Sequence, residues 1–293
     1  MKRHSKIVSM VTLALFLCAN NVHAREMIQI KGSDTLINLV QKLSEVYMEK
    51  NRGKYIAVTG GGSGTGIAAL MNRKCDIADA SRNMKPKEIG RAISLGISPK
   101  RVVIAMDGLS VIVNGDNPVT EFTMEELGKI FRGEVTNWSE MGGDNMPVTL
   151  YGRQSNSGTF VFFRDTVLKS DYSSRMKRMN GNSQIVEAVR HDRSGIGYVG
   201  VGYVKNAAGV DAVSVAAYAG SDYASPLDAA AVKSGKYPIA RPLNQYVNGT
   251  PSGDVRDFIE FELSPEGQRI VEEEGFFPIP KEYEDFNKKS IGR

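Results

Sequence analysis

The sequence predicts an α/β fold, because short strand-type runs alternate with helix-type patterns along the chain. In three places an apolar run ends in a loop rich in glycine, serine or threonine, and a helical pattern begins directly after that loop. These places are residues 28–50, 55–72 and 148–169. A chain of 293 residues can bury an ample core, either as two lobes or as one large domain.

The first 24 residues have the order of a secretory signal peptide. Lys2, Arg3 and Lys6 form a basic start, residues 11–17 form an apolar run, and residues 22–24 place small side chains at the cleavage positions. The apolar run is shorter than the roughly 20 residues that a membrane span needs. We therefore expect export to the periplasm, with a buried N-terminal helix as the alternative.

Cysteine content and charge narrow the class of protein further. Cys18 raises the alternative of a lipid anchor, but Leu17 stands before it, where lipoprotein signals usually carry a small residue. Cleavage after Ala24 removes three basic residues and no acidic ones, so the formal charge falls from +4 to +1. A nearly neutral chain offers no broad surface for nucleic acid. Cys75 then remains alone, and we expect it to be a buried small hydrophobe.

The sequence lacks the residues that a metal site or a hydrolytic active site would need. Beyond residue 24 the chain has one histidine, His191, in a polar stretch, so neither a histidine-based metal cluster nor a convincing Ser-His-Asp triad is available. The glycine-rich run Gly60–Gly66 resembles a nucleotide loop, but Ile67 stands where a phosphate-binding lysine belongs. We expect a protein without enzymatic activity, metal or cofactor.

The loops that open helices have the chemistry of anion sites. The first N–H groups of a helix have no partner within the helix, and serine or threonine hydroxyls and glycine backbone add donors beside them. Such loops stand at Gly32–Thr35, Gly60–Gly66 and Gly152–Thr159. The third carries Arg153, whose guanidinium suits a tetrahedral oxyanion. A fourth candidate is Ala78–Arg82. The alternative for any single loop is an ordinary helix cap.

In this order the loops resemble those of the periplasmic phosphate-binding proteins of bacterial phosphate ABC transporters. The resemblance covers nearly the whole chain after residue 24. Its motifs are GSDT at 32–35, GGGSGTG at 60–66, ASR at 80–82, Arg153 with NSGT at 156–159, and two segments remote from the site, LGKIFRGEVTNW at 127–138 and LSPEGQRIVEEEGFFP at 263–278.

The resemblance implies the type II periplasmic binding protein fold. Each of its two lobes has a mixed sheet flanked by helices, and two crossover strands join the lobes. We place the crossings near Leu109–Asn114 and Arg241–Tyr246, which gives lobe I residues 25–113 with 244–293 and lobe II residues 114–243. The resemblance further implies a monomer that closes on phosphate and docks on a membrane permease.

Matching positions imply the ligand contacts. They are Thr35, Ser63, Arg153, Ser157, Gly158 and Thr159, joined by Ser33 and the backbone N–H of Leu36. The fourth loop adds Ser81 and Arg82 as candidates, which could supply a hydroxyl and a second guanidinium. Arg82 departs from the family pattern, because better-known members have an aspartate there that accepts the proton of phosphate. Asp34 and Asp79 are the nearby carboxylates that could replace it.

Three other functions remain open from the sequence. Without the family aspartate, the ligand could be sulfate, molybdate or another oxyanion. The same clamp could serve a sensor instead of a transporter. A secreted phosphatase is the third reading, against which stands the absence of a metal cluster and of a convincing base near Ser63 or Ser157.

Overall fold

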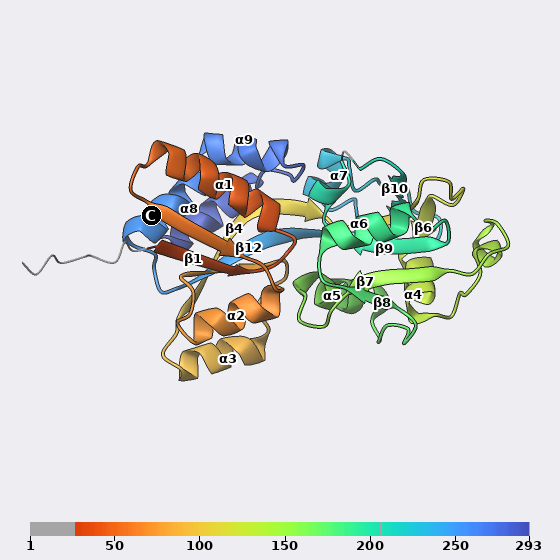
Figure 1. Ribbon diagram of the computed structural model, residues 1–293, viewed down its shortest axis with the longest axis horizontal. Helices are drawn as coiled ribbons and strands as arrows, with labels where there is room; N and C mark the ends of the chain where they lie inside the picture. Colours follow the sequence, from red (N-terminus) through yellow and green to blue (C-terminus); the bar gives the residue numbers. More distant parts are fainter. Residues whose placement is uncertain (1–26, 206, 293) are drawn as a thin grey trace, which may run out of the picture.

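A computed structural model describes residues 27–205 and 207–292. The predicted signal peptide and Cys18 lie outside the described residues. Helices and strands alternate as the sequence predicts, and the strands form two five-stranded sheets and one small pair. Figure 1 shows two lobes side by side, each with helices on both faces of its sheet. The α/β fold with two lobes is confirmed.

Lobe I is built on the first sheet, whose strand order is β2-β1-β3-β12-β4. Strands β1, β2 and β3 run parallel, and β12 pairs antiparallel with both β3 and β4. The strands are β1 (Met27–Gly32), β2 (Tyr55–Thr59), β3 (Ile77–Ala80), β4 (Pro99–Gly108) and β12 (Ala240–Asn248).

Helices cover both faces of this sheet because its side chains are apolar on both faces. Apolar side chains of α1, α8 and α9 pack on one face, and those of α2 and α3 pack on the other. The helices of this lobe are α1 (Ile37–Lys50), α2 (Ser63–Met71), α3 (Pro86–Ser94), α8 (Gly253–Glu262), α9 (Pro265–Glu273) and α10 (Lys281–Ser290).

Lobe II is built on the second sheet, with the strand order β10-β5-β9-β7-β8. Its strands are β5 (Ser110–Asn114), β7 (Thr149–Arg153), β8 (Lys177–Met179), β9 (Gly195–Val199) and β10 (Val210–Ala212). A parallel pair, β6 (Glu121–Thr123) and β11 (Ser214–Ala216), stands beside it.

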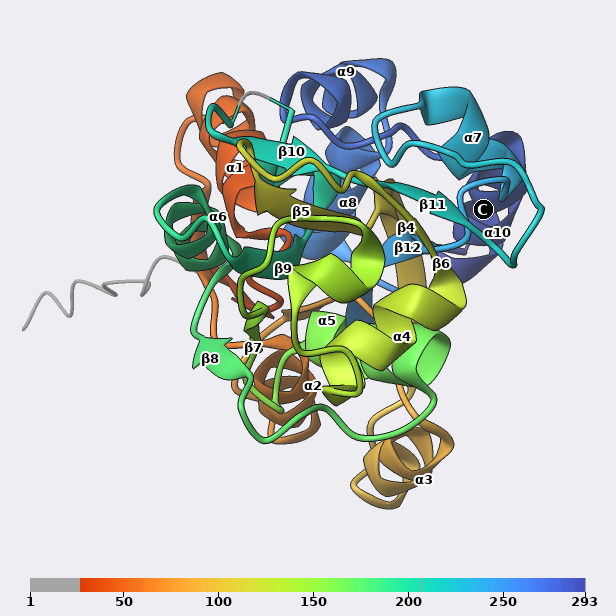
Figure 2. The ribbon, with the colours of Figure 1, turned by 90° about the vertical axis from the view of Figure 1, so that its right-hand side faces the viewer.

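Alternating side chains of the second sheet serve two separate cores. Val111 and Val113 join the core that includes α4 and α5, while Ile112 between them faces α6. Figure 2 views this lobe end-on, with α6 on one side of β9 and α4 and α5 on the other. Its helices are α4 (Met124–Arg132), α5 (Gly158–Phe163), α6 (Asn182–Arg190), α7 (Ala229–Ser234), the 3₁₀ turns η1 (Trp138–Met141) and η3 (Val201–Tyr203), and the π-helix η2 (Arg164–Leu168).

Two neighbouring segments connect the lobes. Leu109 is the one residue between β4 of the first sheet and β5 of the second, and the chain returns to the first sheet at Ala240. The segments run side by side, since the Leu109 N–H donates to the carbonyl of Ile239 and Ala240 pairs with Gly108. Among the described helices, none has the length and apolar character that a membrane span requires.

The predicted boundaries of two helices were wrong. We expected Gly60–Gly66 to be a loop, but α2 already begins at Ser63. Its glycines serve close packing instead, because a Cβ at Gly66 would lie 2.3 Å from the carbonyl oxygen of Lys31. Helix α5 begins at Gly158, two residues before the predicted start, and continues as the π-helix η2.

Two helix starts carry caps that short motifs in the sequence specify. Thr123 and Glu126 form the reciprocal capping box at the start of α4. Ser264 caps α9, and Pro265 occupies its first turn, where a missing N–H costs nothing. These caps belong to the scaffold, because both lie in segments remote from the loops that follow β1, β2, β3 and β7.

Candidate functional site

Four buried hydroxyl side chains follow the three parallel strands of lobe I. Ser33 and Thr35 follow β1, Ser63 follows β2 at the start of α2, and Ser81 follows β3. Because the carboxyl ends of parallel strands meet at one edge of a sheet, these side chains converge there. This edge faces lobe II.

A fifth hydroxyl, that of Thr159 in α5, reaches the same place from lobe II. The Thr159 Oγ1 lies 2.9 Å from the Thr35 Oγ1 and 3.3 Å from the Ser81 Oγ. Ser33 donates to the Ser81 Oγ at 2.9 Å, and the Ser63 Oγ lies 3.4 Å from the same atom. We call Ser33, Thr35, Ser63, Ser81 and Thr159 the hydroxyl cluster.

Glycines allow the lobes to meet around this cluster. A Cβ at Gly158 would lie 2.2 Å from the Ser63 Oγ, so only a bare backbone fits against the hydroxyls. The Gly64 N–H donates to the carbonyl of Asn156 at 3.0 Å, and the Asn156 amide donates to the carbonyl of Gly61 at 2.8 Å. These contacts join the loop after β2 to the loop after β7, so the lobes are closed on each other.

Arg153 lies beside the cluster with more donors than its neighbours can accept. Its side chain is 2 % exposed, and its Nη2 donates to the Asp34 carboxylate and to the carbonyl of Asn180. Its Nε and Nη1 have no hydrogen-bond partner among the described residues. Asp34 also accepts from the Gly61 N–H at 2.8 Å, so it ties this guanidinium to the loop after β2. Donors buried without partners are costly, and an anion would satisfy them.

Two further predicted contacts, Ser157 and Leu36, stand at helix starts. Ser157 is the N-cap of α5, where its hydroxyl accepts from the Phe160 N–H. The Leu36 N–H donates to the Ser33 carbonyl at 3.2 Å, and the Leu36 side chain lies in the lobe I core. Both residues are buried beside the cluster without a hydrogen bond to its hydroxyls among the described residues.

No hydrogen bond joins the Arg82 guanidinium to the hydroxyl cluster among the described residues, and its Nε is buried without a partner there. Its two Nη atoms donate to Glu88 of α3 at 2.7 and 2.8 Å, and Nη1 also donates to the Asn83 carbonyl. Glu88 accepts as well from the Lys85 N–H at the helix start, and hydrogen bonds from Arg82 and Lys85 hold the Glu88 pKa below its usual value against burial. Arg82 therefore ties the loop after β3 to α3.

Asp79 also lies apart from the hydroxyl cluster. It pairs across the sheet with Gln245, with which it shares a hydrogen bond, and Gln245 donates in turn to Glu262 at 3.0 Å. Burial raises the pKa of Asp79 to about 8, and burial together with the Asp79 charge raises that of Glu262 well above its usual value. This carboxyl pair lies inside lobe I.

Sequence reasoning missed Arg241 and Asp107, two buried charges at the cluster. The Arg241 Nε and Nη2 donate to the Asp107 Oδ2 at 2.9 and 2.8 Å, and Nη2 also donates to the Thr159 hydroxyl at 3.1 Å. Burial lowers the pKa of Arg241, and Asp107 opposes that shift. Asp107 directly follows the apolar run 102–106 of β4, and this pattern was the available sign that it needs a buried partner. Arg241 stands in a strand that also carries Asn244 and Gln245, so no such sign marks it in the sequence.

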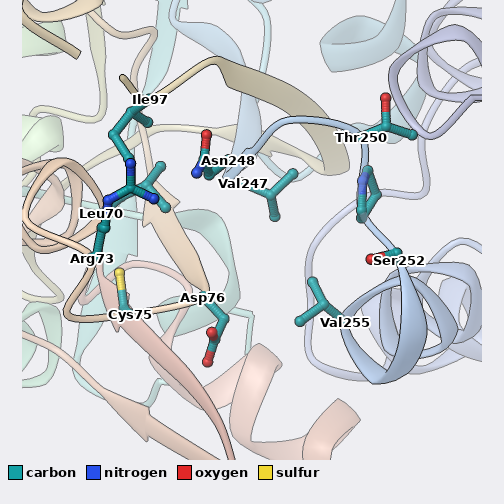
Figure 3. A pocket seen from close by; sticks show the side chains of 11 residues that line it. Leu70, Arg73, Cys75, Asp76, Ile97, Val247, Asn248, Thr250, Ser252 and Val255 are labelled. Carbon is teal, nitrogen blue, oxygen red and sulfur yellow. The ribbon is translucent and has the colours of Figure 1, made fainter. Parts of the chain in front are cut away.

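The cavity drawn in Figure 3 lies at the opposite end of β3 and contains none of the predicted contacts. It has a volume of about 280 Å³, with Arg73 and Cys75 on one side and Thr250 and Ser252 on the other. Cys75 is buried as predicted, and burial raises its pKa to about 12. His191 is exposed, and no group of His, Cys, Asp or Glu among residues 27–205 and 207–292 could hold a metal ion.

Comparison with solved structures finds the same architecture in phosphate-binding proteins. A substrate-binding protein from Clostridium perfringens, solved with bound phosphate, is 28% identical, with a TM-score of 0.77; the match covers 87% of this chain and 100% of that one. An ABC-type phosphate transport receptor from Vibrio cholerae is 27% identical, with a TM-score of 0.69, over 86% of this chain and 100% of that one.

Sequence comparison agrees with this result. The phosphate-binding protein PstS of Pseudomonas aeruginosa is 32% identical over 279 residues, which are 89% of this chain and 85% of that protein. PstS of Borreliella burgdorferi is 29% identical over 95% of this chain and 99% of its own length. Residues 19–266 match the model of the PBP superfamily domain. The chain therefore belongs to the PBP superfamily and, within it, to the PstS-like family of phosphate-binding proteins.

Proposed function

We propose that this chain captures inorganic phosphate between its two lobes and delivers it to an ABC transporter for uptake. Its relatives are substrate-binding proteins, two of them named as phosphate-binding proteins and one solved with phosphate bound. Binding without a chemical step fits a site made of buried hydroxyls and guanidinium groups, with His191 exposed to solvent.

The observation that carries this proposal is the surplus of donors on Arg153 where the two lobes meet. Two of its nitrogen atoms are buried without a partner among the described residues, next to loops that supply serine and threonine hydroxyls. A tetrahedral oxyanion accepts from several donors at once, and charge-assisted hydrogen bonds are the strong ones. Such a ligand contacts both lobes only when they are closed, so binding favours closure.

The proposed contacts come from both lobes. Arg82 is not among them, because Glu88 engages its guanidinium; we assign it to holding the loop after β3 in place. The contacts are Ser33, Thr35, the Leu36 N–H, Ser63, Ser81, Arg153, Ser157, Gly158 and Thr159.

For the acceptor of the phosphate proton we propose Asp34 rather than Asp79. Asp34 pairs with Arg153 at the contact between the lobes, and its side chain is 16% exposed. The Asp79 side chain instead lies inside lobe I, beside Gln245 and Glu262. An acceptor at Asp34 favours protonated phosphate over fully ionised sulfate, because sulfate brings no proton to donate.

We further propose that the lobes divide at the two connections, with residues 25–108 and 240–293 in lobe I and residues 110–239 in lobe II. The limits expected from the sequence, 113/114 and 243/244, fall a few residues later, within β5 of the second sheet and β12 of the first. We place the mature protein in the periplasm after removal of residues 1–24, as a monomer that docks on the permease of the transporter.

Isothermal titration calorimetry of the protein stripped of anion, with phosphate and then with sulfate, tests the function. We expect one-to-one phosphate binding at about 1 μM or tighter, which corresponds to roughly −8 kcal/mol, and no sulfate binding. Comparable sulfate binding would refute the selectivity assigned to Asp34. Binding of neither anion would refute the phosphate assignment.

A further inference from the structure

Arg241 and Asp107 form a fully buried ion pair in the two strands that connect the lobes. They stand directly opposite each other on β12 and β4, and their side chains are 1% and 0% exposed. Replacing such a pair with apolar side chains is often neutral or stabilising, so its presence alone does not indicate a gain in stability. The contacts of the pair indicate what else it does.

These contacts reach both lobes. The Arg241 Nη1 donates to the Ser81 carbonyl at 2.8 Å in lobe I, and its Nη2 donates to the Thr159 hydroxyl at 3.1 Å in lobe II. The Asp107 Oδ1 accepts from the Val201 N–H at 2.8 Å, just after β9 of the second sheet. The ion pair therefore joins the backbone of the loop after β3 to a hydroxyl of α5.

The bond to Thr159 fixes the direction of a proton. A guanidinium has only donors, so Thr159 must accept from it, and the one hydrogen of the Thr159 hydroxyl is left to point elsewhere. The hydroxyls of Thr35 and Ser81 lie 2.9 and 3.3 Å away on the side of the cluster. An anion placed among these hydroxyls would receive that hydrogen.

We infer that Arg241 is a positioning residue of the phosphate site, which acts through Thr159 by holding its hydroxyl as a donor toward the anion while the lobes are closed. This inference rests on the proposed function. Asp107 balances the charge of Arg241, and the Phe162 ring lies 5.1 Å from its guanidinium carbon. Arg241 therefore acts by orienting Thr159, in contrast to Arg153, which keeps two nitrogen atoms without a partner among the described residues.

A double-mutant cycle on phosphate affinity tests this role. Thr159→Val removes the hydroxyl at nearly constant shape, and Arg241→Lys keeps a positive charge beside Asp107 but loses the fork that reaches Thr159 and Ser81. We expect each single variant to weaken phosphate binding about 5- to 10-fold, as for loss of one buried hydrogen bond. The double variant should bind no more than about twofold more weakly than Thr159→Val alone, because the two changes remove one interaction.

Controls separate positioning from general damage. Arg269→Lys changes an exposed arginine in an i,i+4 pair and should leave phosphate affinity unchanged. Thr159→Ser keeps the hydroxyl, should bind within about threefold of the wild type, and should remain sensitive to Arg241→Lys. Single variants whose losses multiply in the double variant, or Arg241→Lys with unchanged affinity, would overturn the inference.

A measurement on the unaltered protein guards against variants that fail to fold. The Arg241–Thr159 bond forms only when the lobes are closed, so phosphate should slow the hydrogen exchange of the Arg241 side chain, as seen by NMR. Equal exchange with and without phosphate in a binding protein would overturn this inference alone. A wild-type protein that does not bind phosphate would overturn the proposed function as well.

Discussion

At the scale of single residues, Arg153 and Arg241 show two uses of a buried guanidinium. Arg241 is compensated by Asp107 and bonded to the Ser81 carbonyl and the Thr159 hydroxyl. Arg153 pairs with Asp34 but keeps two nitrogen atoms without partners among the described residues. Arg153, with donors left over, is suited to bind a ligand, and Arg241 is suited to fix its neighbours in place. The reason is that a buried donor without a partner costs more free energy than a formed hydrogen bond gains.

Replacing Arg153 should therefore weaken binding directly. We expect Arg153→Lys to lower phosphate affinity roughly 30-fold, which corresponds to about 2 kcal/mol for charge-assisted hydrogen bonds that a lysine cannot reproduce. Titration calorimetry measures the change, with Arg269→Lys as the exposed arginine control. An affinity within threefold of the wild type would contradict the assignment of Arg153 to the ligand.

Asp79 and Glu262 should make stability fall as pH rises. Burial raises the pKa of Asp79 from 3.8 to about 8, so the unfolded chain releases this proton near pH 4 while the folded protein keeps it until about pH 8. Between these values the unfolded state binds fewer protons, and the free energy of unfolding decreases with pH. Above pH 8 the contribution of Asp79 becomes constant.

Asp79→Asn should reduce this pH dependence. The amide carries no charge, so the variant should gain stability relative to the wild type between pH 5 and pH 8, as measured by urea unfolding at several pH values. Asp222→Asn changes an exposed carboxylate and serves as the control. If both variants follow the wild-type pH dependence, Asp79 does not titrate in this range.

At the scale of elements, glycines decide where helices can meet. Helix α2 starts at Ser63, directly after Gly62, whose φ of +89° is favourable only for glycine. Helix α5 starts at Gly158, which has no room for a side chain against Ser63. The two helix starts thus approach each other across the lobes through bare backbone.

Gly158→Ala should separate closure from folding. The added methyl would collide with the Ser63 hydroxyl only in the closed arrangement, so we expect at least a tenfold loss of phosphate affinity with little change in the melting temperature of the ligand-free protein. Gly90→Ala is the matched control on α3, where a Cβ meets nothing within 4 Å. The control should keep its affinity and gain about 0.5–1 kcal/mol of stability. Equal affinity in both variants would refute the role of Gly158.

At the scale of the whole molecule, two antiparallel connections leave the lobes free to close as units. Each lobe has a core built mainly from its own sheet and helices, with Val201 of η3 packed into the core of lobe I and Met106 of β4 packed into that of lobe II. Among the described residues, the chain passes between the sheets only at Leu109 and just before Ala240. Side chains and backbone of the loops after β2 and β7 make the contacts that hold the closed form. A ligand among these loops adds its contacts to both lobes at once.

Phosphate should therefore shrink and stabilise the protein. Small-angle X-ray scattering should give a smaller radius of gyration with phosphate than without it. A concentration 1,000 times the Kd should add about 4.1 kcal/mol to the stability of the closed form, which raises the melting temperature. Sulfate at the same concentration is the control. Identical scattering curves with and without phosphate would show that binding does not close the lobes.

The sequence by itself determined the α/β class, the positions of the anion-type loops and two helix caps. These features are local: a strand of apolar residues, a cap at Thr123 or Ser264, and a glycine-rich loop are all defined within a few residues of each other. The family resemblance then supplied the two-lobed arrangement and the residues expected to contact phosphate. The two-lobed arrangement and the expected contacts both follow from short motifs that occur in a fixed order along the chain.

The tertiary structure alone decided which polar side chains reach the site. Asp79 lies in β3, and Ser81 and Arg82 directly follow that strand, yet Glu88 of α3 holds the Arg82 guanidinium and Gln245 of β12 pairs with Asp79. Arg241 reaches Thr159 from 82 residues away. The reason is physical: a buried charge takes the partner that the packing of distant strands and helices places beside it, and spacing along the chain does not contain that information.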